Sequence, residues 1–113
     1  MLYGKIWGNT QCIFNKNNVS IYRIAINKNA KCSKHYHLHK FNTFFVESGV
    51  LKVSIYQKDY PLVDETILKS GDSTTVKPGL FHVFEALEDT IAYEIYHIEL
   101  NEDDIFRENC GSQ

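Results

Sequence analysis

Short runs of β-forming residues, each closed by a turn signal, recur along this chain of 113 residues. They lie about 8–12 residues apart, which is the spacing typical of a β-sandwich or a β-barrel. The run over 50–57 shows the pattern clearly, because the apolar residues Leu51, Val53 and Ile55 alternate with more polar ones. Such alternation predicts a strand with one buried face. We therefore expect an all-β fold.

Seven further strands are expected from similar runs with flanking turn residues. They cover residues 11–15, 19–27, 42–47, 62–68, 73–76, 81–86 and 90–98. The last two are expected to pair with each other around a turn at 87–89. Only the C-terminal tail suggests a helix, because Asn101 suits an N-cap, acidic residues follow it and Gly111 suits a helix stop.

Two histidines, His35 and His37, occupy alternate positions in the stretch from Asn29 to Gly49. A strand would point both imidazoles to the same face. Neutral imidazole binds zinc, copper, iron and nickel well, so this pair is a natural start to a metal site. By the same strand parity, we expect Cys32 on the opposite face from His35, as a structural thiol.

A second stretch carries a third histidine directly after a turn signal. Pro78 fixes its own φ and Gly79 allows a positive φ, so the chain is expected to turn sharply there. His82 then falls at the start of the next expected strand. We expect a further turn at Gly71 and a positive φ at Gly79.

Together these two stretches, over residues 29–86, resemble the two motifs of the cupin superfamily. The first reads Asn29-x5-His35-x-His37-x4-Asn42-x6-Gly49, and the second runs from Gly71 through Gly79 to His82 with the family's distances. Four positions depart from the pattern: Asn29 replaces a glycine, Asn42 replaces a glutamate, Pro78 lies one place late and Ala86 replaces an asparagine. Asparagine is the next-best residue where a positive φ is needed, so the change at Asn29 is mild.

The resemblance implies a double-stranded β-helix, the jelly-roll-like cupin barrel, to which the tail would add a short C-terminal helix. The length of the chain suggests one domain, which we expect to span residues 1–113. Short barrels of this kind often pair through edges or faces, so a homodimer is also expected.

The resemblance further implies that His35, His37 and His82 converge on a divalent metal ion, which can be zinc, iron, manganese or nickel. Asn42 would be a weaker fourth ligand, because the glutamate it replaces is usually a metal ligand in the family. An amide oxygen supplies a dipole where a carboxylate supplies a charge. Two alternatives stay open: a decayed site that holds metal loosely, and histidines that are satisfied by hydrogen bonds alone.

Small cupins of this kind are similar to sugar and sugar-phosphate isomerases and epimerases. The resemblance therefore implies a metal-dependent proton transfer next to a carbonyl in a small polar molecule or sugar. Glu94 is the candidate acid/base residue, although its place in an apolar strand fits an outward-facing residue equally well. A non-catalytic barrel that binds a small ligand and an iron-dependent three-histidine dioxygenase remain as alternatives.

The other polar residues near the motifs are less informative. His39 is expected to be exposed and His97 to be structural. The cations Arg23, Lys31 and Lys40 would suit an anionic ligand, but a solvated surface is the default interpretation for each.

Composition excludes several classes of partner. The net charge of −2 provides no basic field for nucleic acid or an anionic membrane surface. No apolar run approaches the roughly 18 residues that span a membrane, and the first eight residues do not resemble a signal peptide. Three widely spaced cysteines, without an export signal, predict reduced thiols and a cytoplasmic location.

Overall fold

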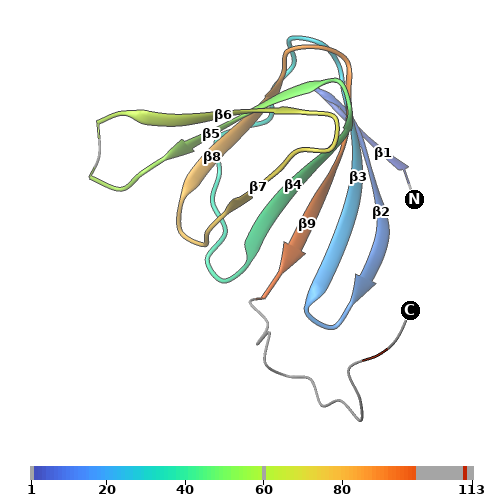
Figure 1. Ribbon diagram of the computed structural model, residues 1–113, viewed down its shortest axis with the longest axis horizontal. Coiled ribbons are helices and arrows are strands. Elements are labelled where there is room, and N and C mark those ends of the chain that lie inside the picture. Colours follow the sequence, from blue (N-terminus) through green and yellow to red (C-terminus); the bar gives the residue numbers. More distant parts are fainter. Residues whose placement is uncertain (1, 60, 99–110, 112–113) are drawn as a thin grey trace.

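The computed structural model describes residues 2–59, 61–98 and 111. Within these residues it contains nine strands, which form two antiparallel sheets that face each other (Figure 1). The strands are β1 (Leu2–Lys5), β2 (Gly8–Lys16), β3 (Val19–Ile26), β4 (Phe41–Ser48), β5 (Val50–Tyr56), β6 (Val63–Lys69), β7 (Ser73–Val76), β8 (Phe81–Ala86) and β9 (Thr90–His97). The larger sheet has the order β1-β2-β3-β9-β4-β7 and the smaller one the order β6-β5-β8.

The all-β expectation is confirmed, and the described residues contain no helix. The expected C-terminal helix falls on residues 101–110, which lie outside the described part of the chain. Strand β1 was not among the expected strands. No helix in the described residues is long and apolar enough to cross a membrane.

The hydrophobic core lies between the two sheets, because each strand sends alternate side chains inwards. Buried side chains of the larger sheet include Ile24, Phe44 and Ala92, and those of the smaller sheet include Leu51 and Phe84. Each of these is at most 2% exposed. Burial of an aliphatic or aromatic side chain stabilises a fold by about 1.5–3 kcal/mol, so this interior holds the sheets together.

The expected pairing of β8 with β9 is wrong. Strand β8 pairs with β5, whereas β9 lies between β3 and β4 in the other sheet. The link at 87–89 therefore crosses between sheets. Its exit is anchored by Thr90, whose Oγ1 accepts a hydrogen bond from the Val50 N–H at 3.1 Å and donates to the Glu88 carbonyl at 2.8 Å. Alternation in the sequence indicates that a strand has a buried face but not which strand it pairs with. The sequence of a link between two sheets therefore looks like that of a hairpin.

The segment at 27–40, which carries His35 and His37, forms no regular strand. It runs beside β8, where isolated bridges pair Lys31 with Glu85 and His35 with His82. Two backbone hydrogen bonds, of 2.8 and 3.2 Å, join His35 to His82. The path of this segment is thus set by β8.

The turn residues adopt the expected backbone conformations. The φ angle is +88° at Gly71, +85° at Gly79 and +69° at Asn29, so all three lie in the left-handed region. Gly49, between β4 and β5, has a φ of +94°, and a Cβ atom there would lie 2.3 Å from the Asp89 carbonyl oxygen. Position 49 therefore requires glycine both for its positive φ and for the lack of a side chain. Position 79 requires it for the positive φ alone, because no heavy atom lies within 4 Å of a Cβ atom built there.

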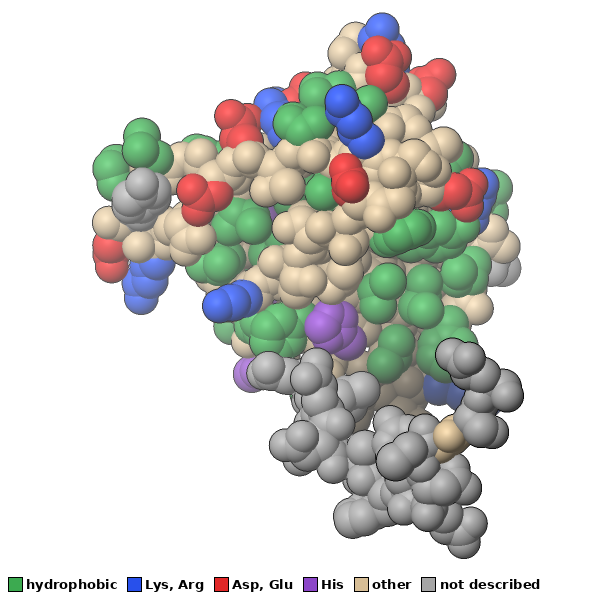
Figure 2. Space-filling model, in the orientation of Figure 1, with side chains coloured by type: hydrophobic (Ala, Val, Ile, Leu, Met, Phe, Trp, Pro, Cys, Tyr) green, Lys and Arg blue, Asp and Glu red, His purple; other side chains and the backbone are tan. Residues whose placement is uncertain are grey.

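One face of the molecule shows how charge is distributed over the surface. In Figure 2, acidic and basic side chains are interspersed along the upper edge, and hydrophobic side chains gather on the right-hand half. This face carries no continuous basic patch.

We predict that Gly49→Ala and Gly79→Ala destabilise the protein to different extents. Gly79→Ala should lower the free energy of unfolding by about 1–2 kcal/mol, because only backbone strain is added. Gly49→Ala should lower it by about 2–5 kcal/mol, because the new methyl also overlaps the backbone at Asp89. Urea denaturation measures both values, with Gly4→Ala as the control that has neither constraint. Equal losses of unfolding free energy in Gly49→Ala and Gly79→Ala would contradict the expected overlap at Asp89.

Candidate metal centre

Three histidines meet where the segment at 27–40 lies against β8. His35 and His37 come from this segment, and His82 is the second residue of β8. The ligand atoms that they offer all lie within 4.8 Å of one another. The ring centroids of His35 and His82 are 4.4 Å apart. The convergence expected from the motifs is therefore present.

Backbone carbonyls set the tautomers of two of these rings. His35 Nδ1 lies 2.7 Å from the Ser33 carbonyl oxygen, and His82 Nδ1 lies 3.0 Å from that of Leu80. A carbonyl only accepts, so each Nδ1 carries the hydrogen and donates it. Each Nε2 then presents a lone pair, and that of His82 lies 3.5 Å from the Asn42 amide nitrogen. This arrangement, with one ring nitrogen held by an outer partner, is typical of histidines that bind metals.

Two buried polar atoms beside the cluster have no hydrogen-bond partner within the described residues. They are Nε2 of His37 and Oδ1 of Asn42. Unpaired buried polar atoms are rare in folded proteins, because burial removes their hydrogen bonds to water and no protein hydrogen bond replaces them. A cation at the cluster would pair Nε2 of His37, whereas the Asn42 atom beside His82 is the amide nitrogen Nδ2. The donor set of three imidazole nitrogens fits a divalent metal ion.

Asn42 lies at the edge of the cluster, fully buried as the second residue of β4. Its Nδ2 is 3.5 Å from His82 Nε2 and donates a hydrogen bond to Glu94 Oε2 at 3.3 Å. The amide therefore links the histidines to a carboxyl group on β9. Its role as a metal ligand stays a prediction.

Glu94 faces the interior of the barrel, so of the two orientations left open by the sequence the inward one is present. Its side chain is 7% exposed and accepts hydrogen bonds from Tyr96 Oη at 2.8 Å and from the Asn42 amide. Burial raises the pKa of Glu94, and the two hydrogen bonds act in the opposite direction. Burial and the neighbouring Glu94 also raise the pKa of Tyr96. Burial therefore makes the ionised form of Glu94 more costly than in water, and the two hydrogen bonds offset part of this cost.

The surroundings of His37 and His82 favour the neutral forms of their rings. Burial, followed by the charges of Lys40, His35 and His82, lowers the pKa of His37 to about 4. Burial also lowers the pKa of His82, although the hydrogen bond to Leu80 opposes this shift. Only neutral imidazole binds a metal, so the site keeps these two rings in the form that ligation needs.

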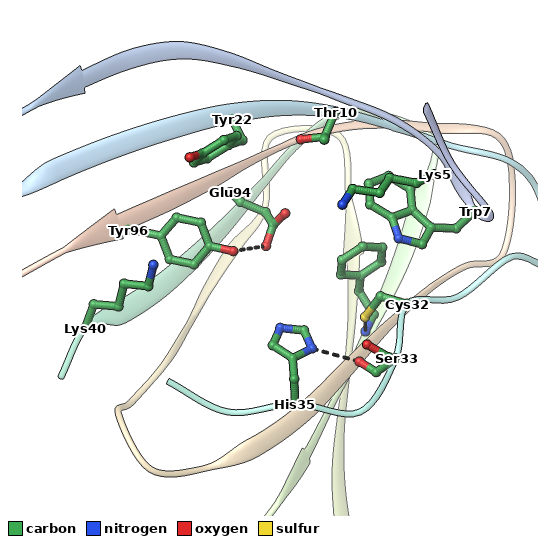
Figure 3. A pocket seen from close by; sticks show the side chains of 11 residues that line it. Lys5, Trp7, Thr10, Tyr22, Cys32, Ser33, His35, Lys40, Glu94 and Tyr96 are labelled. Carbon is green, nitrogen blue, oxygen red and sulfur yellow. Dashed lines mark hydrogen bonds between the residues drawn. The ribbon is translucent and has the colours of Figure 1, made fainter. Parts of the chain in front are cut away.

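A cavity of about 390 Å³ opens beside the cluster (Figure 3). Its walls come from both sheets and from the segment at 27–40, and the lining residues are Lys5, Trp7, Thr10, Tyr22, Cys32, Ser33, His35, Lys40, Phe84, Glu94 and Tyr96. The candidate metal centre therefore adjoins a space in which His35, Glu94 and Tyr96 can meet a small molecule. Lys5, Trp7, Thr10, Tyr22 and Tyr96 were not expected there. Of these residues, only Tyr96 could have been placed beside Glu94 from the sequence, because it lies two residues later and shares the same strand face.

Cys32 lines the same cavity as His35, so the expectation that they lie on opposite faces is wrong. Parity fails because residues 27–40 do not keep the regular pleat of a strand. The sulfur accepts a hydrogen bond from the Phe84 N–H at 3.2 Å, and burial raises the thiol pKa to about 11. The thiol is therefore protonated at neutral pH, which agrees with the structural role expected for it.

The remaining polar candidates have other positions. His39 is exposed, as expected. His97 Nε2 lies 2.9 Å from Thr43 Oγ1 and its ring stacks on Phe41, which supports a structural role. Of the cations, Lys40 lines the cavity, whereas Lys31 lines a separate groove on the smaller sheet. Arg23 does not line the cavity.

Known proteins resemble this chain as follows. A family model described as Cupin matches residues 6–108. KdgF from a Halomonas species aligns with a TM-score of 0.75 and 14% identity, over 88% of this chain and 89% of that one. An oxalate decarboxylase from Lactobacillus farciminis, in a formate complex, aligns with a TM-score of 0.77 and 14% identity, over 92% of this chain and 32% of that one. A cupin superfamily protein from Desulfitobacterium hafniense aligns with a TM-score of 0.67 and 11% identity, over 80% and 76%. No curated protein sequence matches this chain.

At these identities the solved structures show a common fold and no more. The family model, by contrast, covers most of the chain, including the segment at 27–40 and strand β8, which bring the three histidines together. The double-stranded β-helix expected from the two motifs is confirmed, and the chain belongs to the cupin family.

Proposed function

We propose that this protein is a metal-dependent enzyme that moves a proton next to the carbonyl group of a small polar molecule, as an isomerase or epimerase does. The observation that carries the proposal is the position of Glu94. It is a buried carboxyl group in the wall of a cavity, and a single amide, that of Asn42, separates it from the histidine cluster. A carboxyl group in this position can accept a proton from a bound molecule and return it.

His35, His37 and His82 would hold the divalent ion, which can be zinc, iron, manganese or nickel, and Asn42 would add a neutral oxygen. When bound, such an ion supplies Lewis acidity to a carbonyl oxygen. The lack of a carboxylate among these four residues leaves that acidity undiminished by a ligand charge.

Glu94 would perform the proton transfer. In its ionised form it removes the hydrogen from the carbon next to the carbonyl, and the C–H electron pair forms a carbon–carbon double bond while the carbonyl π pair moves to oxygen. Return of the proton to the former carbonyl carbon, with transfer of the proton of the neighbouring hydroxyl to the former carbonyl oxygen, isomerises the substrate, because the neighbouring carbon becomes the carbonyl. Return of the proton to the original carbon, after the intermediate has turned its opposite face to Glu94, re-forms the carbonyl and epimerises the substrate. A raised pKa suits this role, because a carboxyl group that holds a proton more readily is the stronger base.

Tyr96 and Asn42 would orient that carboxyl group. Both donate to the same Glu94 oxygen, Oε2, at 2.8 and 3.3 Å. The other oxygen is then left to face the cavity and the substrate. Tyr96 is itself held by Lys40, whose Nζ lies 4.0 Å from the ring centroid.

We predict that the protein binds one zinc ion per chain through the three histidines. His35→Ala should lower the zinc affinity by more than about a hundredfold, because loss of a ligand exceeds the usual effect of losing an outer partner. Isothermal titration calorimetry with zinc chloride measures this change. His39→Ala is the matched control, because His39 is exposed and lies outside the cluster. Unchanged affinity in His35→Ala would refute the metal centre.

We predict that His37 makes the metal-free protein less stable in mild acid. Its folded pKa of about 4 lies below its ordinary value of 6.5, so the unfolded state binds more protons in this interval. The stability that neutral His37 contributes is complete above pH 6.5 and is lost as the pH falls towards 4. We would measure the free energy of unfolding of wild type and of His37→Gln by urea denaturation. The value for wild type minus that for His37→Gln should decrease as the pH falls from 6.5 to 4. A difference that is independent of pH would contradict the neutral state of His37.

We predict that Glu94→Gln strongly lowers turnover while metal binding persists. Wild type and variant, both loaded with zinc, would be assayed for solvent deuterium incorporation and isomerisation with a panel of aldoses, ketoses and their phosphates. Loss of a general base typically lowers the rate by about 10²–10⁴-fold. Glu88→Gln is the control, because Glu88 is an exposed residue in a surface ion pair. A wild type that binds zinc but exchanges no proton would favour a non-catalytic ligand-binding barrel.

A further inference from the structure

The cavity continues beyond the histidine cluster to a second end that the proposed mechanism does not use. Lys5, Trp7 and Thr10 line this end, and all three come from β1, β2 and the turn between them. Figure 3 shows Lys5 with its amino group directed into the cavity, across from His35 and Lys40. A cation therefore faces the space from each end.

The turn that follows Lys5 is held firmly against the barrel. The Asn27 N–H donates to the Trp7 carbonyl at 2.8 Å, and the Trp7 ring packs edge-on against Phe84 with centroids 5.1 Å apart. Gly8 lies so close to β3 that a Cβ atom would meet the Ala25 carbonyl oxygen at 1.8 Å. Lys5 is thus mounted on a fixed base, although its own side chain is exposed at the mouth of the cavity.

The charges of the cavity are unbalanced. The side chain of Lys5 makes no ion pair, hydrogen bond or cation–π contact with any other residue in the described part of the chain. Lys40 has the Tyr96 ring as its partner. Glu94 is the one acidic residue among the lining residues, and it is engaged by neutral donors. Two lysines therefore face a space with a single carboxyl group.

We propose that Lys5, with Thr10 and Trp7 beside it, binds the anionic group of the substrate, which is therefore a small hydroxylated acid or phosphate ester. The orientation, with the carbonyl end at the histidines and Glu94, rests on the proposed function. The volume of about 390 Å³ falls in the range of sites that take small molecules. The ammonium supplies the charge, the Thr10 hydroxyl a hydrogen bond, and the Trp7 ring an apolar surface for the carbon chain.

The experiment compares two ligands with the same carbon skeleton. Gluconate carries a carboxylate where glucitol carries a hydroxymethyl group, and neither has the carbonyl needed for turnover. Calorimetry on the metal-free and the zinc-loaded protein should show that gluconate binds about 10–100-fold more tightly than glucitol in both forms. Glucose 1-phosphate, measured against glucose, separates a preference for phosphate from one for carboxylate.

Lys5→Met should remove this preference and leave glucitol binding unchanged. Lys5→Arg should retain most of it, and Lys58→Met, at an exposed lysine away from the cavity, should behave as wild type. The proposal is overturned if gluconate and glucose 1-phosphate bind no better than their neutral counterparts, or if Lys5→Met and Lys58→Met have equal effects.

The two proposals fail in different ways. Anion binding that depends on Lys5, without any proton exchange by the zinc-loaded protein, would support the anion site and refute the isomerase. Turnover of a neutral sugar that is lost in Glu94→Gln and unaffected by Lys5→Met would support the isomerase and refute the anion site.

Discussion

The site depends on two backbone hydrogen bonds between His35 and His82. His35 lies in a segment without regular strand structure, so the path of this segment depends on its bonds to neighbouring elements. The bonds to β8, extended by a hydrogen bond from the Cys32 N–H to the Phe84 carbonyl, hold the segment against the smaller sheet. His37 follows on the same segment, and its carbonyl accepts from Gly79, in the turn before β8. The three imidazoles meet because the backbone of one segment is paired with the strand that carries the third.

Desolvation is the second constraint, and it acts in the same sense on His37, His82 and Glu94. Burial favours the neutral forms of His37, His82 and Glu94. A buried charge without a counter-ion is costly, and no cation forms an ion pair with Glu94 within the described residues. The interior therefore offers neutral imidazole ligands to a metal ion. The two lysines at the cavity add positive charge, which is the basis of our proposal that the ligand is an anion.

Much of the fold could be predicted because its signals are local. A positive φ at Gly79 follows from the identity of one residue and its neighbour, and the alternation around Leu51 reports a half-buried strand. The pairing of β8 with β9 could not be predicted correctly, because a link between two sheets and a hairpin have the same sequence signature. The orientation of Glu94 was open for a related reason, since both faces of β9 carry apolar residues.

The sequence by itself determined the turns, the alternating strands and the spacing of the histidines within the two motifs. Each of these depends on a few φ and ψ angles or on residue order along one segment. Only the tertiary structure decided that Cys32 shares a cavity with His35, that Glu94 reaches Asn42, and that Lys5 lies across from the cluster. These contacts join segments far apart in the chain, and they depend on which strands pair and how closely the two sheets pack, which no local pattern specifies.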